Sequence, residues 1–220
     1  QQRDLTSFED KGIVGNRSVK YDCVNCHAVS SGAPDRMLLQ LRSETIGPRM
    51  ILAHDGHISR ISTATDFNRS ASSYVAWHPS GQIVAFAAIK VTQFFHTMGE
   101  TRDVFDQSSD LGIYLVDSNT VTTTPAIARP DRLETYPAWS PDGKYLYFCS
   151  GPQLPIERFS EVKYDLMRIS YDPRSSQWGE LEMVLTAQQI KGSVTHPKLS
   201  PDGRFLLFCV CDYGNFSIYH

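Results

Sequence analysis

The stretch Tyr136-Pro137-Ala138-Trp139-Ser140-Pro141-Asp142-Gly143, followed by Lys144-Tyr145-Leu146-Tyr147-Phe148, decides the fold of this chain. In its centre, proline fixes φ at the first turn position, aspartate bonds back to the backbone, and glycine accepts a positive φ. The apolar residues on both sides are typical of buried β-strands. The stretch therefore predicts two strands joined by a tight turn.

The same pattern occurs twice more. Ser73–Phe86 contains the turn His78-Pro79-Ser80-Gly81, and His196–Phe208 contains Ser200-Pro201-Asp202-Gly203. The turn glycines recur at intervals of 62 and 60 residues. A repeat of this length indicates one structural unit per copy.

Each copy contains further strand-like segments. Third strands are expected at Gly112–Val116, Asp165–Ile169 and Phe216–Tyr219, and fourth strands at Val121–Ile127 and Glu180–Leu185. Units of four strands that repeat along a chain are typical of β-propeller blades. The predicted fold class is therefore all-β, a β-propeller of four-stranded antiparallel blades.

A second motif lies near the N-terminus, at Cys23-Val24-Asn25-Cys26-His27. C-x-x-C-H is the attachment signature for c-type haem. Two thiols add to the vinyl groups of one porphyrin, and the adjacent imidazole can take an axial position on the iron. The predicted cofactor is one covalent haem c, bound by Cys23, Cys26 and His27. A redox thiol pair or disulfide and half of a zinc site are the alternatives.

The iron would take a sixth ligand, a histidine or a methionine. We expect the segment from Lys90 to Asp110 to be a long loop on the propeller face that carries the C-x-x-C-H motif. This loop contains His96, the first choice for the sixth ligand, and Met98, the second choice. A solvent-facing His96 and a Met98 packed on nearby phenylalanines are the alternative interpretation.

The three repeats resemble the blades of TolB-like β-propellers, through blocks such as P-A-W-S-P-D-G-K-Y-L-Y-F, over about residues 67–220. Together with the upstream C-V-N-C-H segment, they are similar to bacterial proteins that join a haem-c motif to a TolB-like propeller. The resemblance implies a propeller fold and a location outside the cytoplasm. It implies little about mechanism, because propellers serve many functions.

Two regions are expected. Residues 1–47 would be an N-terminal haem-binding segment, packed on the first blade or forming part of it, and residues 48–220 would be the TolB-like blades. If the segment belongs to the first blade, Cys23–His27 is its innermost strand and Ala33–Leu41 its second. Met50–Ala53 and Ile58–Ile61 would follow as the third and fourth. About three to four blades are present, so we expect an incomplete propeller that is truncated at the C-terminus.

Several other residues have a structural interpretation. His78 occupies the turn position that Ser140 and Ser200 hold in the other copies, which favours a structural role. His196 could face the central channel. Cys149, Cys209 and Cys211 are expected to be buried side chains. An acidic string is expected to be a solvated loop, with a calcium site as the alternative; its members are Glu100, Asp103, Asp106 and Asp110.

Composition and the absence of certain sequence motifs limit the functions that the sequence predicts. The net charge of −3 carries no nucleic-acid signature, and no apolar run is long enough to cross a membrane. The chain contains no G-x-S-x-G, P-loop or H-E-x-x-H motif, so no catalytic residue is predicted. Covalent haem is attached outside the cytoplasm, so the expected location is the periplasm or outer surface of a Gram-negative bacterium, with a leader removed. In a cytoplasm without attachment machinery, the motif would stay empty.

The sequence thus predicts electron transfer to or from a partner redox protein. The alternative is a propeller that binds a cell-envelope protein, with a C-x-x-C-H site that is structural, sensory or empty. An open iron position would instead indicate catalysis, as in a peroxidase.

Overall fold

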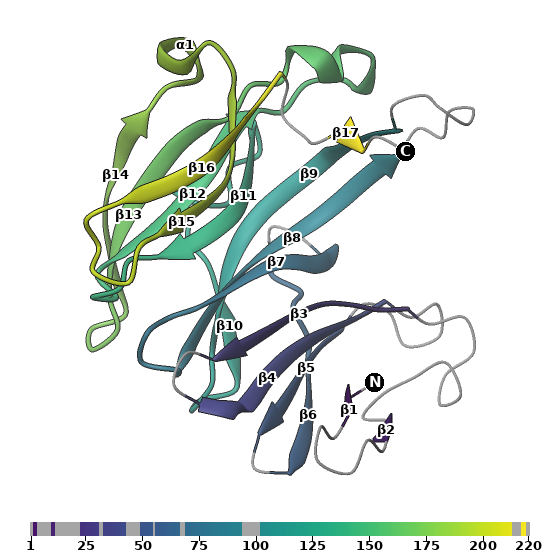
Figure 1. Cartoon of the computed structure of the whole chain (residues 1–220), viewed down its shortest axis with the longest axis vertical. Coiled ribbons are helices and arrows are strands. Elements are labelled where there is room, and N and C mark those ends of the chain that lie inside the picture. The colour runs from purple at the N-terminus through teal and green to yellow at the C-terminus, as the bar shows by residue number, and fades with distance from the viewer. Residues whose placement is uncertain are drawn as a thin grey trace.

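The computed structural model describes residues 2–3, 10–11, 23–30, 33–42, 49–54, 56–66, 69–93, 102–212 and 217–218. Within these residues the chain forms successive antiparallel sheets (Figure 1). A two-stranded sheet of β1 (Gln2–Arg3) and β2 (Asp10–Lys11) comes before four larger or later sheets, which are numbered here from first to fourth in chain order. The first contains β3 (Cys23–Ser30), β4 (Ala33–Arg42), β5 (Arg49–His54) and β6 (His57–Ile61), and the second contains β7 (Ala71–Trp77), β8 (Ile83–Gln93), β9 (Arg102–Leu115) and β10 (Thr120–Thr122). The third contains β11 (Arg132–Trp139), β12 (Tyr145–Pro152), β13 (Asp165–Asp172) and β14 (Gln177–Leu185), and the fourth contains β15 (Ser193–Leu199) and β16 (Leu206–Cys211).

The sheets follow one another as propeller blades do. Within each sheet the strands pair in chain order, and the first strands of successive sheets lie side by side, β3 beside β7, β7 beside β11 and β11 beside β15. A 3-10 helix, η1 (Ile156–Glu161), connects β12 to β13, and a short helix, α1 (Ala187–Ile190), connects β14 to β15. The predicted all-β architecture of four-stranded antiparallel sheets is confirmed, and the strands expected around residues 23–61 form the first sheet.

The repeated turn forms as its residues predict. In the third sheet the Ser140 amide donates to Tyr145 O at 2.8 Å, and the Gly143 amide donates to Ser140 O at 2.9 Å. The Ser140 hydroxyl donates to Asp142 Oδ1 at 2.6 Å, and the same bond joins Ser200 to Asp202. Gly143 has a φ of 72°. The turn is therefore held by its own side chains.

His78 adds a bond between two sheets. Its Nδ1 lies 2.7 Å from Ser80 Oγ within its own turn, and its Nε2 lies 3.0 Å from the carbonyl oxygen of Gly143 in the next one. Because the carbonyl can only accept, Nε2 carries the proton. The ring is buried and meets Trp139 edge-on at 4.9 Å, and burial lowers its pKa. The structural role predicted for His78 is confirmed.

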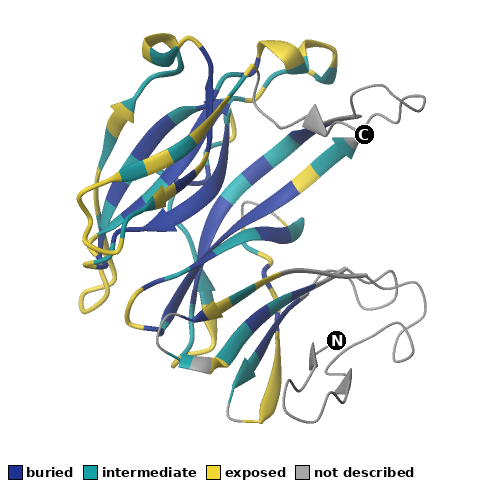
Figure 2. Cartoon of the chain, in the orientation of Figure 1, coloured by how far each residue is buried: buried dark blue, intermediate teal, exposed yellow. Residues whose placement is uncertain are grey.

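Strand β8 of the second sheet is buried on both faces from Ile83 to Ile89 (Figure 2). Alternate residues of β8, Ile83, Ala85 and Ala87, pack in one core cluster with Trp139 and Phe148 of the third sheet. The residues between them pack in a second cluster with the first sheet, and these are Val84, Phe86 and Ala88 against Leu38, Met50 and Leu52. Successive side chains of a β-strand point to opposite faces of the sheet. Strand β8 therefore packs against the third sheet with one face and against the first sheet with the other, and so joins three blades.

The prediction of a long loop between Lys90 and Asp110 is wrong for most of these residues. β8 continues to Gln93 and β9 begins at Arg102, so that Gln93 pairs with Val104. Val104 and Phe105 are buried, and this apolar contact favours a continued hairpin over a loop. Asp106 is only 7% exposed, so it does not belong to a solvated acidic loop. Glu100, His96 and Met98 lie outside the described residues.

Three smaller predictions are also wrong. Ser217–Ile218 (β17), expected in the last blade, pairs with Asp103 and Arg102 of β9, because the extended part of β9 reaches beyond the pairing with β10 and leaves an edge for it. The strand expected over Val121–Ile127 is only Thr120–Thr122. Cys209 is exposed and Cys211 half-buried because they lie on β16, whose only partner strand in the described structure is β15.

Gly143 provides a test of the contact between the second and third sheets. A Cβ at Gly143 would overlap the His78 ring, whereas a Cβ at Gly203, in the equivalent turn, meets only Pro141 atoms at 3.8 Å or more. Both glycines have a φ near 70°. We expect Gly203→Ala to cost about 1–2 kcal/mol for the left-handed backbone. Gly143→Ala should cost about 1–3 kcal/mol more for the overlap. Urea unfolding of both variants measures the difference, and equal losses would contradict the contact.

A second test concerns Glu134 of β11. Its side chain is 1% exposed and accepts a hydrogen bond from the Arg129 amide at 3.3 Å. Burial raises the pKa of Glu134 from 4.5 to about 8. Because the folded-state pKa exceeds the unfolded one, Glu134 supports folding fully below pH 4.5, and this support is lost as the pH rises towards 8.

We therefore expect Glu134→Gln to gain stability relative to the wild type between pH 5 and pH 8, by at most about 1.4 kcal/mol per pH unit. Urea unfolding across this range is the measurement. Glu180→Gln, at an exposed position of β14, is the control and should leave the pH dependence unchanged. Parallel curves for Glu134→Gln and the wild type would show that Glu134 is ionised in the folded protein.

Candidate functional site

A cavity of about 470 Å³ lies where the four innermost strands meet. Each strand contributes to its wall, and the lining residues are His27 of β3, Tyr74 and Val75 of β7, Tyr136 and Pro137 of β11, and His196, Pro197 and Lys198 of β15. The wall therefore combines two imidazoles, two phenol rings, two prolines and one cation.

An irregularity in each inner strand forms this wall. The pairing of β7, β11 and β15 with their second strands shifts register at a β-bulge, and the bulge contains Tyr74, Tyr136 and His196 respectively. Their φ values are 43°, 53° and 52°, a backbone conformation that is uncommon outside glycine. A bulge redirects the side chain of the extra residue. The repeated bulge thus brings three aromatic rings to one place.

The first blade has the same bulge. In β3, Asn25 pairs with Gln40 and Ala28 pairs with Leu38, three residues against two. Ser73 and Ala76 of β7 face Ala87 and Ala85 with the same spacing. Cys26 and His27 therefore occupy the register positions of Tyr74 and Val75. The C-x-x-C-H motif thus lies on an innermost strand, across the bulge.

The three aromatic rings form one cluster. The ring centroids of Tyr74 and Tyr136 are 4.4 Å apart, and those of Tyr136 and His196 are 4.2 Å apart. His196 meets Tyr74 edge-on at 5.9 Å. Tyr136 is buried, which raises its pKa well above the usual value. His196 is exposed overall, although its ring packs against Tyr136 and Tyr74. Partial burial, with the charge of Lys198, lowers its pKa.

Hydrogen bonds from neighbouring elements support the cluster. Tyr164, immediately before β13, meets Tyr136 edge-on at 6.3 Å, and its hydroxyl donates to Asp106 Oδ2 at 2.9 Å. The backbone amide of Tyr164 is also fixed, because it donates a hydrogen bond to Ser193 Oγ at 2.8 Å. The amide of Val194 in turn donates to Tyr164 O at 2.9 Å. These bonds tie β15, which carries His196, to the third sheet.

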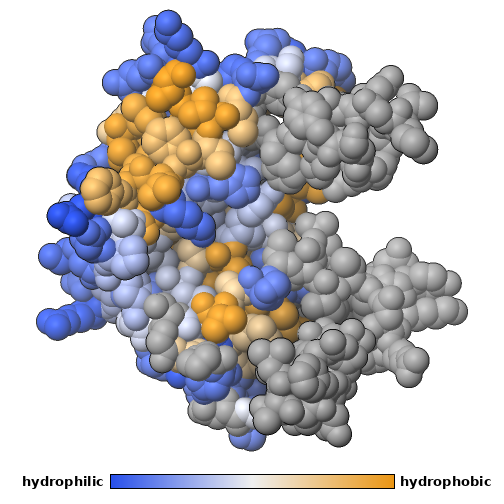
Figure 3. Space-filling model, viewed as in Figure 1, coloured by the Kyte–Doolittle hydropathy of each residue, from blue (hydrophilic) through white to orange (hydrophobic). Residues whose placement is uncertain are grey.

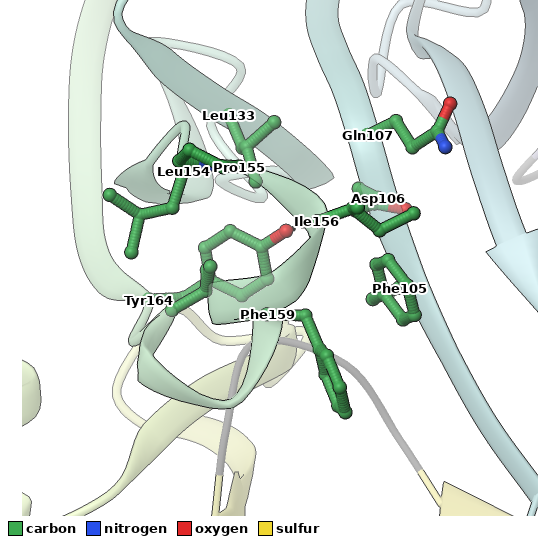
Figure 4. Close-up of a pocket in the computed structure, with 10 residues that line it drawn as sticks. Phe105, Asp106, Gln107, Leu133, Leu154, Pro155, Ile156, Phe159 and Tyr164 are labelled. Carbon is green, nitrogen blue, oxygen red and sulfur yellow. Dashed lines mark hydrogen bonds between the residues drawn. The ribbon is translucent and has the colours of Figure 1, made fainter.

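A second, smaller cavity lies beside this support (Figure 4). Its volume is about 170 Å³, and it lies between β9 and the segment that contains η1. Phe105 and Phe159 stack across it at 4.7 Å, and the Tyr164–Asp106 pair closes one side. No histidine or cysteine is among its described lining residues. We therefore regard the larger cavity, between the four innermost strands, as the candidate site.

The structure brings together only part of the predicted site. His27 is exposed and lines the cavity. Cys23 and Cys26 lie in β3, with side chains outside the described part of the structure, and His96 and Met98 lie outside it altogether. No group of three or more histidine, cysteine, aspartate or glutamate side chains suited to a metal ion occurs among the described residues. The sequence pattern does not assign His196 to ligand binding, although the place of His196 in the repeat matches those of Tyr74 and Tyr136.

The residues around the cavity fit a porphyrin. His27 presents an imidazole, a common axial ligand for haem iron. The tyrosine and proline side chains offer the apolar, aromatic wall that is typical of cofactor sites, and the volume is within their usual range. Lys198 is the cation that could pair with a propionate. The donor set and the wall therefore suit a haem.

Comparison with known proteins identifies the fold. Neither a protein-family model nor a curated protein matches the sequence. Among solved structures, a protein assigned as TolB from Agrobacterium tumefaciens is similar, with a TM-score of 0.55 and 17% identity over 89% of this chain and 66% of that one. The chain has a TolB-like β-propeller fold.

A luciferin-regenerating enzyme matches this propeller with a TM-score of 0.51 and 15% identity, over 85% of this chain and 55% of that one. Prolyl oligopeptidase B from Galerina marginata matches with a TM-score of 0.46 and 11% identity, over 77% of this chain and 23% of that one. The chain thus spans just under two thirds of the TolB structure and about half of the luciferin-regenerating enzyme. At these identities the similarity shows the fold alone.

The support of the cavity wall can be tested at Tyr164. Tyr164→Phe removes the hydroxyl that donates to buried Asp106, and the loss should cost about 1–3 kcal/mol of stability. Tyr147→Phe is the matched control, because its hydroxyl accepts from Arg168 Nη1 at the partly exposed surface of β12 and water can replace it. Urea unfolding compares the two variants. Equal, small losses would contradict a supporting role for the Tyr164–Asp106 bond.

Proposed function

We propose that this chain is an extracytoplasmic mono-haem c-type propeller protein that transfers electrons to or from a partner redox protein. One observation carries the proposal: His27, the last residue of the C-x-x-C-H motif, lines the cavity between the four innermost strands. A C-x-x-C-H motif that arose by chance would not be expected on an innermost strand, next to a cavity of the size that cofactors occupy.

Each residue of the site would have its own role in haem binding. Cys23 and Cys26 would form the two thioethers, and His27 would occupy one axial position. Tyr74, Tyr136 and the two prolines would keep water from one face of the cofactor, and Lys198 would bind a propionate. When bound, haem c would supply a single one-electron redox couple. A single couple calls for a partner redox protein. His96, or Met98 as second choice, was the sequence-based expectation for the sixth ligand.

The proposed location follows from the attachment chemistry. Thioether formation takes place outside the cytoplasm, so we propose the periplasm or the outer surface of a Gram-negative bacterium. Among the described residues, no helix is both long and apolar enough to cross a membrane. Nothing in the charge of the chain indicates a nucleic-acid partner.

A second candidate is a propeller that binds a cell-envelope protein. Phe205 beside β16, and Leu207 and Val210 within it, are 63%, 62% and 55% exposed. Figure 3 shows an apolar patch where β15 and β16 lie. Exposed apolar groups of this kind often mark interaction sites. In this second function the C-x-x-C-H site would be structural, sensory or empty.

Haem attachment is the test that separates the two functions. The chain should be exported in a host with c-type maturation machinery, and then examined by haem staining of a denaturing gel and by a reduced-minus-oxidised spectrum. We expect one covalent haem per chain. The variant Cys23→Ala/Cys26→Ala should lose the stain because no thioether can form, whereas Cys209→Ala, at an exposed free cysteine, should keep it. An unstained, folded wild type would remove the haem proposal and leave the binding propeller.

A further inference from the structure

We infer that His196 is the second axial ligand of this haem site, facing His27 across the cavity. The inference rests on the proposed function and deepens it, because the identity of the sixth ligand decides whether the iron is closed to external ligands. It differs from the sequence-based expectation of His96, which lies 100 residues earlier in the chain.

Register supports the assignment first. Cys26 in β3 and His196 in β15 occupy the same position of the repeated bulge, on the first and last of the four innermost strands. Equivalent positions on inner strands surround one axis. A porphyrin attached at Cys26 would therefore lie in the cavity that His196 also lines. His27 and His196 are the two histidines of that wall.

The change from tyrosine to histidine in the fourth sheet also supports the assignment of His196 as a ligand. At this bulge position the second and third sheets carry Tyr74 and Tyr136, and the fourth carries His196. All three rings pack together, so packing alone would be served by a third tyrosine. Histidine adds a nitrogen lone pair, which is the group that a haem iron binds.

His196 is also held in place. Its φ of 52° and the following Pro197 restrict the backbone. The ring packs at a tilt against Tyr136, with centroids 4.2 Å apart, and meets Tyr74 edge-on. The ring is nevertheless exposed, and it lines the cavity. A ligand oriented before the metal binds loses little conformational freedom on coordination.

The other described histidines are poorly placed. Both ring nitrogens of His78 are engaged, by Ser80 and by the carbonyl of Gly143. His54 and His57 lie in β5 and β6, the third and fourth strands of the first sheet, away from the inner strands. Within the described residues, His196 is therefore the partner for His27.

Two imidazole ligands would make the iron six-coordinate. Such a site has no open position for a substrate or gas, and its potential is lower than that of a site with histidine and methionine. The ligand pair therefore favours electron transfer over catalysis at the same site.

The experiment uses the full chain, matured with covalent haem. Absorption and electron paramagnetic resonance spectra report the spin state, and a redox titration reports the potential. We expect a low-spin wild type. His196→Ala should become high-spin and bind added cyanide or carbon monoxide at least tenfold more tightly, and added imidazole should restore the low-spin spectrum. His196→Met should raise the potential.

Three further variants complete the test. His196→Phe keeps the aromatic packing but offers no nitrogen, so it should match His196→Ala in spin state if the alanine variant folds poorly. His57→Ala, at an exposed histidine of β6, should remain low-spin. A low-spin His196→Phe together with a high-spin His96→Ala would overturn the inference and leave the haem proposal intact. A wild type without covalent haem would remove both.

Discussion

The β-bulge in each innermost strand is the constraint on which the rest of this structure depends. It recurs at Cys26, Tyr74, Tyr136 and His196, and the last three residues adopt a positive φ. Such a conformation is costly for residues other than glycine, so the surroundings have to hold it in place. Here the packed rings of Tyr74, Tyr136 and His196 and the buried bond of Tyr164 to Asp106 do so. The same bulges create the wall of the cavity.

The packing between blades makes this arrangement rigid. β8 contributes alternate residues to two separate cores, and His78 joins the turn of one blade to the carbonyl of Gly143 in the next. Movement of one blade against another would disrupt both contacts. These contacts hold the first three blades, which carry three of the four strands that line the cavity. Such support would suit the proposed electron transfer, since a redox centre works best when its surroundings change little between oxidation states. The TolB-like fold supplies this framework, but the fold by itself does not indicate a function.

Function is proposed to arise where the repeat departs from its own pattern. The bulge position carries tyrosine in two blades, cysteine in the first and histidine in the fourth. The two departures are the residues that a covalently attached, doubly ligated haem would use. The apolar residues of β16 are a separate feature, and they offer a surface on which a partner protein could dock.

The sequence alone determined the turns and most of the strands, because proline, aspartate, glycine and alternating apolar residues act locally. It also pointed to His27 and to the structural role of His78. Only the tertiary structure decided that β8 and β9 extend into the expected loop and that Ser217–Ile218 pairs with β9, since both depend on pairing between strands and not on local sequence pattern. The sequence suggested separately that Cys23–His27 forms an innermost strand and that His196 could face the channel. Only the tertiary structure shows that His27 and His196 line one cavity, because four strands far apart in the chain surround one axis.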